Sequence, residues 1–132
     1  MSSPAALPEP TPPSQGGATP SGWWAVCLCA AWCGTCGIYR PLFDELARAH
    51  PDVQFEWVDI EDESDLVGDL DVETFPTLLI ADGERALFLG PLLPQAPVLA
   101  RLLASLQAAP GSAGAGGEAQ GVFERVRSAR SR

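Results

Sequence analysis

Residues 32–36 read Trp32-Cys33-Gly34-Thr35-Cys36, and the rest of the chain is organised around this stretch. It follows an apolar run and opens a helical pattern. Two cysteines separated by two residues at the start of a helix can bring their sulfurs within disulfide distance inside one turn. The start of a helix also has unpaired N–H groups and the positive end of the helix dipole, which favour a thiolate. The spacing therefore predicts a redox-active cysteine pair.

The segments on either side of this stretch predict a strand and a helix. Residues 24–30 form a short continuous apolar run, which is typical of a central strand buried on both faces. Such a strand would deliver the cysteine pair to the carboxyl edge of a sheet, where open α/β folds place their sites. Residues 35–50 have a helical pattern, and we expect Ile38, Leu42 and Leu46 to form its buried stripe.

The rest of the chain predicts an α/β fold with a mixed sheet. A strand after the helix completes a βαβ unit, and an Asp-Gly turn between two later apolar segments indicates a hairpin. An acidic segment between them predicts a short helix with a solvated surface; a calcium site is the alternative, but the spacing does not match an EF-hand loop. The predicted elements are a strand at 53–60, a strand at 78–80, a strand at 85–89 and a helix at 97–106.

Composition divides the chain into one domain and two tails. Residues 1–22 are rich in Pro, Gly and Ser, and residues 110–121 are rich in Gly and Ala. Neither segment offers enough apolar surface to offset chain entropy, so we expect a disordered leader at 1–22 and a disordered tail with a basic end at 110–132. Residues 23–109 remain as one domain with one hydrophobic core.

Charge and hydropathy narrow the function classes. The net charge is −9, and this surface would repel phosphate backbones, so we expect no nucleic-acid partner. No apolar run is long enough to span a bilayer, and no charged segment typical of a secretory signal precedes Arg40, so we expect no membrane association. The expected compartment is the cytoplasm, where four cysteines are typically catalytic or metal-binding.

Three features together resemble the thioredoxin family. The Trp-Cys-Gly-Thr-Cys stretch is the first, and Pro41, five residues after the second cysteine, is another. The third is residues 76–78, Pro-Thr-Leu, just before an apolar strand. The resemblance covers about residues 23–107 and implies a thioredoxin-like fold, in which a mixed central sheet is flanked by helices.

The resemblance also implies roles for the residues of the motif. Cys33 would be the exposed nucleophile and Cys36 the resolving thiol, and a redox-active Cys33–Cys36 disulfide would serve in place of any other cofactor. Trp32 would shield the pair. Pro76 would follow a cis peptide bond facing the disulfide, and the backbone of Phe75 would bind an extended substrate.

Further residues and partners follow from the same resemblance. Gly34, Thr35 and Gly90 would belong to the substrate-binding surface. The implied activity is a protein-disulfide reductase acting on disulfides of protein substrates as a monomer. Its electrons would come from a thioredoxin-reductase-like or glutathione-linked donor.

The sequence departs from the family pattern at three positions. Thr35 stands where thioredoxins have proline between the cysteines, and the resemblance implies that this dipeptide tunes the redox potential. Cys27 stands in the place of a buried aspartate, and Trp57 in the place of the lysine that pairs with it. Because both partners are replaced, no unpaired charge is left in the core. Our hypothesis is that Cys36 lacks a nearby base and resolves mixed disulfides slowly.

Two alternatives to redox chemistry stay open. Four cysteines in the pattern C-x-C-x₃-C-x₂-C are enough for a zinc site, although Cys27 and Cys29 would share a strand face while the other two lie beyond its end. In the structural interpretation Cys27 and Cys29 are small buried hydrophobic residues. The second alternative is a binding or assembly module that uses its acidic surface with little redox activity.

Overall fold

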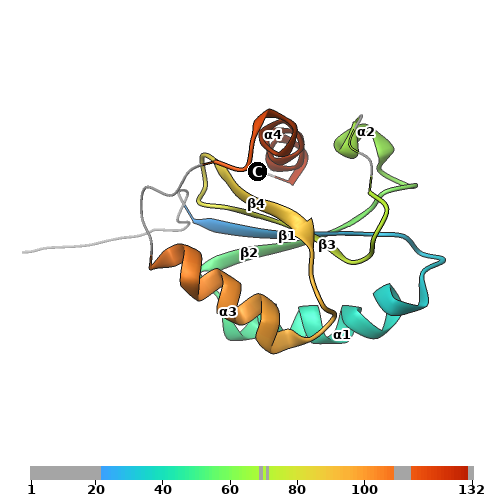
Figure 1. Ribbon diagram of the computed structural model, residues 1–132, viewed down its shortest axis with the longest axis horizontal. Coiled ribbons are helices and arrows are strands. Elements are labelled where there is room, and N and C mark those ends of the chain that lie inside the picture. Colours follow the sequence, from blue (N-terminus) through green and yellow to red (C-terminus); the bar gives the residue numbers. More distant parts are fainter. Residues whose placement is uncertain (1–21, 69, 71, 109–113, 131–132) are drawn as a thin grey trace, which may run out of the picture.

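The computed structural model describes residues 22–68, 70, 72–108 and 114–130. Its elements follow the order predicted for the domain and add one helix at the end (Figure 1). They are β1 (Trp23–Cys29), α1 (Gly34–Ala49), β2 (Val53–Asp59), α2 (Ser64–Val67), β3 (Thr77–Ala81), β4 (Ala86–Pro91), α3 (Ala96–Gln107) and α4 (Gly117–Arg130). The predicted leader lies outside the described residues except for Gly22.

The sheet is mixed, as expected. Within the described residues it contains four strands in the order β2-β1-β3-β4. β1 pairs with β2 in parallel and with β3 antiparallel, and β3 pairs with β4 antiparallel. β3 and β4 form the hairpin predicted from Asp82-Gly83; Gly83 has φ 106°, which favours glycine, and the N–H of Asp82 donates to the carbonyl of Arg85 at 3.0 Å. The expected α/β class with a mixed sheet is confirmed.

β1 is the central strand, and both of its faces are covered. Successive side chains of a strand point to opposite faces. Trp24, Val26 and Leu28 therefore belong to one hydrophobic cluster, and Cys27 and Cys29 belong to the other. Figure 1 shows α1 and α3 on one side of the sheet, and α2 and α4 on the opposite side. The two cysteines face α1 and α3 because the cluster that contains them also holds residues of those helices.

The buried stripe of α1 differs from the predicted one. Cys36, Tyr39, Phe43 and Leu46 are buried, whereas Ile38 is 70% exposed. These four residues are spaced by three, four and three positions, which keeps them on one side of a helix with 3.6 residues per turn. The predicted stripe started from Ile38 and so missed Cys36 as an inward-facing residue.

The prediction that residues 110–132 form a disordered tail was wrong for residues 117–130, which form α4. Its buried residues are Ala119, Val122, Phe123 and Val126. Their spacing of three, one and three positions is that of a helix stripe that faces the core. The glycine-rich composition of residues 110–121 had favoured disorder over this helix. The ring of Phe123 meets that of Trp24 edge to face at a centroid distance of 5.7 Å.

Arg125 joins α4 to the end of α2. Its Nε donates to the carbonyl of Leu66 at 2.9 Å, and its Nη2 donates to the carbonyl of Val67 at 3.1 Å. Carbonyls at a helix C-terminus lack helical partners, and a cation satisfies them well. Gly68 has φ 65°, and a Cβ there would lie 2.6 Å from Nη2 of Arg125. The positive φ favours glycine at this position, and a larger residue would also have to displace the end of the Arg125 side chain.

Arg130, at the end of α4, binds two carboxylates. Its Nε lies 2.9 Å from Oε1 of Glu56, and its two Nη atoms each lie 2.8 Å from a carboxylate oxygen of Glu63. The hydrogen bonds from Arg130 lower the pKa of Glu63 below its usual range. The basic end of the chain, predicted to be solvated, thus connects α4 to β2 and to the segment before α2.

We predict that Phe123→Ala lowers the free energy of unfolding by about 3–5 kcal/mol, the usual cost of emptying a buried phenylalanine site. Urea denaturation followed by tryptophan fluorescence would measure the change. Ser128→Ala, on the exposed side of α4, is the matched control and should leave stability unchanged. Equal midpoints for Phe123→Ala and the unmutated chain would mean that α4 does not pack on the sheet.

We also predict that Glu63→Gln destabilises the chain by about 1 kcal/mol at neutral pH, since the pair is partly exposed and screened by solvent. A lowered carboxyl pKa stabilises the fold above the unfolded pKa, about 4.3 for Glu, and the effect is lost as pH falls through the folded pKa. The stability difference between Glu63→Gln and the unmutated chain should therefore vanish in acid. A difference that is independent of pH would contradict the assignment.

Candidate functional site

Cys33 lies where the central strand gives way to α1. It is the N-cap residue of α1, with φ −85° and ψ 119°, and its N–H donates to the carbonyl of Ala30 at 3.0 Å. The N–H of Gly37 donates to the carbonyl of Cys33 at 3.3 Å, which closes the first helical turn. Cys33 is a half-buried free thiol. Its sulfur therefore stands at the positive end of the α1 dipole with partial access to solvent.

Cys36 is one turn into α1, as expected, but its partner is different. It is 3% exposed and forms a disulfide with Cys29, with 5.9 Å between their Cα atoms. The expected Cys33–Cys36 disulfide is therefore not the one present. The reason is geometric: Cys29 is on the face of β1 that is covered by α1, and Cys36 is on the buried stripe of α1. The period-two alternation of the strand indicates that Cys27 and Cys29 share a face, but only the packing of α1 on that face brings Cys36 to Cys29.

Cys27 is a fully buried thiol beside the disulfide. Its Sγ lies 3.7 Å from the Sγ of Cys29. Burial raises the pKa of Cys27 far above its ordinary value, although the positive charge of Arg40 opposes this. Cys27 also pairs in register with Trp57 on β2, so the two residues that replace the aspartate and lysine are neighbours across the sheet. The hydroxyl of Tyr39 is buried in the same cluster without a hydrogen-bond partner among the described residues.

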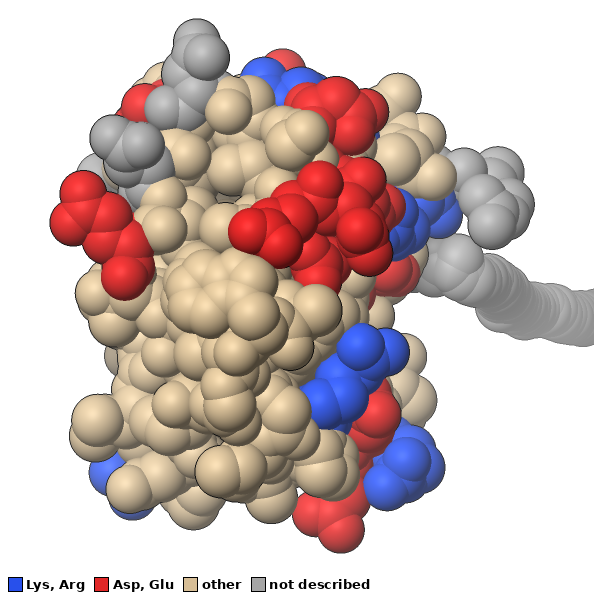
Figure 2. Space-filling view, turned by 90° about the vertical axis from the view of Figure 1, so that its right-hand side faces the viewer, with Lys and Arg blue, Asp and Glu red and all other residues tan. Residues whose placement is uncertain are grey.

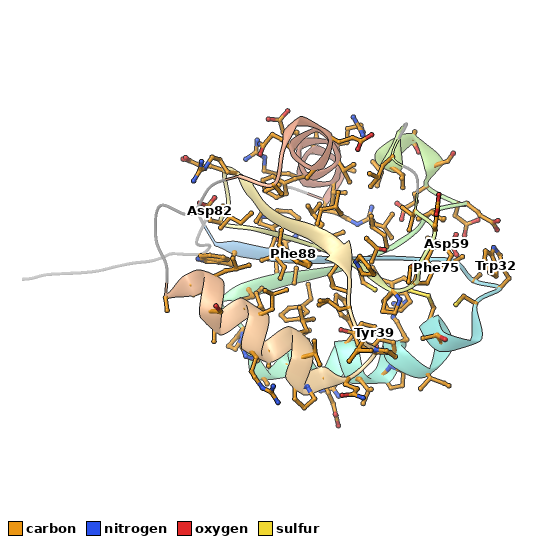
Figure 3. All side chains as sticks on the ribbon, viewed as in Figure 1. Trp32, Tyr39, Asp59, Phe75, Asp82 and Phe88 are labelled. Carbon is orange, nitrogen blue, oxygen red and sulfur yellow. A yellow bond between two sulfur atoms is a disulfide. The ribbon has the colours of Figure 1, made fainter. Side chains whose placement is uncertain are left out.

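Aromatic residues surround the strand–helix junction. Trp32 is 66% exposed, and its ring meets the ring of Phe75 edge to face at a centroid distance of 5.5 Å. Figure 3 shows Trp32 and Phe75 together at the end of the molecule where β1 leads into α1. Nε1 of Trp32 donates to Oε2 of Glu61 at 3.0 Å. The peptide bond between Phe75 and Pro76 is cis, which confirms that expectation.

The other three predicted residues are distributed between α1 and β4. Gly34 and Thr35 are the first two residues of α1, and a Cβ on Gly34 would meet no atom within 4 Å. Gly90 pairs with Leu78 across the β3–β4 ladder. A Cβ on Gly90 would come within 3.3 Å of the Phe88 ring, so a larger residue there would press on that side chain.

A cavity of about 500 Å³ borders Cys36 on the side of β2. Its wall includes Arg40, Trp57 and Glu63, and the guanidinium carbon of Arg40 lies 4.7 Å from the centroid of the Trp57 ring. No pattern in the sequence indicated a role for Arg40, whose positive charge opposes the rise in the pKa of Cys27. Cys36 is the half of the disulfide that lies at the wall of this cavity.

The outer surface at the end of the molecule where β1 leads into α1 is uncharged in its centre. Figure 2 shows the uncharged surface, with a group of acidic side chains above it. The exposed large hydrophobic residues of the described chain are Trp32, Ile38 and Leu93. The hydrogen bond from Trp32 to Glu61 joins the aromatic and acidic parts of this surface.

Among the described residues, no group of three or more His, Cys, Asp or Glu side chains has an arrangement that could hold a metal ion. None of their helices is both long enough and apolar enough to cross a membrane.

Comparison with known proteins agrees with the motif. The family model described as thioredoxin matches residues 19–89, so the chain belongs to the thioredoxin family. It is 39% identical over 61 residues to a thioredoxin H-type of Picea mariana, covering 46% of this chain and 49% of that protein. It is 38% identical over 58 residues to a thioredoxin H-type of Brassica campestris, covering 44% and 47%. The chain thus spans about half the length of these curated relatives.

Solved structures agree with the fold. The Fasciola hepatica thioredoxin matches with a TM-score of 0.59 and 21% identity, covering 64% of this chain and 81% of that one. Oxidised thioredoxin O1 of Arabidopsis thaliana matches with a TM-score of 0.56 and 28% identity, covering 65% and 78%.

Proposed function

We propose that the chain is a thiol–disulfide oxidoreductase that reduces or exchanges disulfides in protein substrates through Cys33 and Cys36. The observation that carries the proposal is the position of Cys33: a half-buried free thiol at the N-cap of α1, one turn before a buried cysteine. Dithiol exchange requires an accessible sulfur and a second sulfur close enough to resolve the mixed disulfide.

In the first step Cys33 attacks a substrate disulfide as a thiolate. A bond forms between Cys33 and one substrate sulfur, and the other substrate sulfur leaves as a thiolate that takes up a proton. Cys33 is the N-cap residue of α1, and the first turn of this helix contains no acidic residue. No carboxylate of that turn therefore repels the sulfur as it attacks.

In the second step Cys36 resolves the mixed disulfide. Its thiolate attacks Cys33, forms the Cys33–Cys36 disulfide and releases the second substrate thiol, so the substrate gains two electrons and two protons in all. Cys36 must be a free thiol at this point. The Cys29–Cys36 disulfide must therefore open before the step can take place.

Substrate binding would use the uncharged surface around the junction. Trp32 and Phe75 offer aromatic area there, and Pro76, which has no N–H, leaves the neighbouring backbone to pair with an extended peptide. Gly34, at the exposed start of α1, leaves space for the approach. The acidic group beside this surface favours substrates with basic faces (Figure 2).

The remaining parts of the proposal follow from membership of the family. The electron donor would be a thioredoxin-reductase-like or glutathione-linked system, the compartment the cytoplasm, and the working form a monomer. No nucleic acid or membrane partner is part of the proposal, given the net charge of −9.

A binding or assembly module is a second candidate. The observation that favours it is that Cys36 is bonded to Cys29, which leaves Cys33 without a resolving partner in this state. The two candidates differ in what happens when both cysteines of the motif are replaced. A module would keep its client, whereas an oxidoreductase would lose its activity.

We predict that Cys33→Ser and the double variant Cys33→Ser, Cys36→Ser reduce insulin disulfides at the uncatalysed rate. Cys36→Ser alone should accumulate a mixed disulfide with insulin, because attack proceeds and resolution does not. Dithiothreitol as donor and insulin turbidity as readout would measure both, with Ser105→Ala on the exposed side of α3 as the control. Full turnover by the double variant would refute the roles given to Cys33 and Cys36, and an unmutated chain that does not accelerate insulin reduction would favour the binding module.

We also predict that Cys27→Asp accelerates turnover at neutral pH, because a buried carboxylate would supply the base that Cys36 lacks. The gain should fade in acid as that carboxyl group becomes protonated. Cys27→Asn, which has the same shape without the carboxylate, is the matched control. An unchanged or lower rate for Cys27→Asp would count against the missing-base hypothesis.

A further inference from the structure

We propose that Cys36 is shared between two mutually exclusive disulfides, one to Cys29 and one to Cys33, and that Cys29 is a third redox-active residue. The observation is the juxtaposition of strand and helix: Cys29 ends the central strand on the face covered by α1, and Cys36 points into the core from the first turn of α1. Cys33 begins the same helix and packs against the same cluster. The sulfur of Cys36 can therefore form a disulfide with either Cys29 or Cys33.

Burial determines how the internal disulfide can open. Cys29 is 0% exposed and Cys36 is 3% exposed, so a reductant in solution meets almost no sulfur surface. Cys33 is the half-buried thiol beside them. Cys27 touches Cys29, but burial raises its pKa, so it remains a protonated thiol and is a poor competing nucleophile. The remaining route from solvent is the cavity beside Cys36.

The internal step needs no outside oxidant or reductant. The thiolate of Cys33 attacks Sγ of Cys36, the Cys33–Cys36 bond forms and the Cys29–Cys36 bond breaks. Cys29 leaves as a thiolate and takes up one proton, while Cys33 has given up one. The chain keeps one disulfide throughout, and only its position changes. The reverse step restores the Cys29–Cys36 disulfide and frees the thiol of Cys33.

The consequence for turnover rests on the proposed function, whereas the pairing itself does not. While the disulfide joins Cys29 to Cys36, the resolving thiol is unavailable and Cys33 can only form a mixed disulfide. When the disulfide joins Cys33 to Cys36, it is in the position that the resolution step creates. Cys29 would thus hold the chain in a state that captures substrates without releasing them.

A peptide map distinguishes the two disulfides. Cleavage by chymotrypsin after Trp24, Trp32 and Tyr39 places Cys27 and Cys29 on fragment 25–32, and Cys33 and Cys36 on fragment 33–39. The full chain would be oxidised with oxidised dithiothreitol, quenched in acid, alkylated with N-ethylmaleimide in denaturant and digested. We expect a pair of cross-linked fragments with one adduct on each. Finding only fragment 33–39 closed on itself, with two adducts on fragment 25–32, would overturn the proposal.

Two variants test whether Cys29 or Cys27 is the strand cysteine that bonds to Cys36. Cys29→Ala should lose the cross-link and move the disulfide into fragment 33–39. Cys27→Ala removes the other buried thiol from the same strand face and should keep the cross-link. A cross-link that persists in Cys29→Ala and disappears in Cys27→Ala would overturn the assignment of Cys29.

The rate of opening tests the route through Cys33. Cys33→Ser should still form the Cys29–Cys36 cross-link, and dithiothreitol should reduce it several-fold more slowly than in the unmutated chain. Equal rates would mean that the cavity admits the reductant directly, and would overturn the internal exchange. The map and the rates need no protein substrate, so a chain that shows the cross-link but fails to reduce insulin would refute the proposed function and leave this inference intact.

Discussion

The burial of β1 on both faces is the constraint on which the rest of the structure depends. Strand geometry sends Trp24, Val26 and Leu28 toward one layer of helices, and Cys27 and Cys29 toward the other. A helix is needed over each face of β1, because the apolar side chains of an uncovered face would be exposed to water. α4 supplies cover on the first face, and α1 supplies it on the second (Figure 1). The same alternation places a cysteine of the strand against the start of α1.

Local pattern was sufficient to predict most of the domain. The apolar run before Cys33, the Asp-Gly turn and the helical periodicities each depend on neighbours within a few residues, and β1, the β3–β4 hairpin and α3 lie where they were expected. The error in α1 came from choosing Ile38 as the start of the stripe. A helix with polar and apolar residues on several sides permits more than one stripe, and packing against β1 selects the one that contains Cys36.

Two features depend on how separate elements pack against one another and could not be read from local pattern. The composition of α4 is a poor predictor of a helix. The helix is held against the sheet by the contact of Phe123 with Trp24. Arg130 also binds Glu56 and Glu63. The disulfide is the other: spacing favours Cys33 with Cys36, but the fold brings Cys29 to the same sulfur.

The account rests on one thiol, Cys33, being the reactive sulfur at the junction of strand and helix, with the other three cysteines held in the core. The direct measurement is alkylation of the native, fully reduced chain with a limiting amount of iodoacetamide, followed by mass analysis of the chymotryptic fragments. The account predicts that the first adduct is on Cys33. A first adduct on Cys27, Cys29 or Cys36, with Cys33 unreacted, would contradict it.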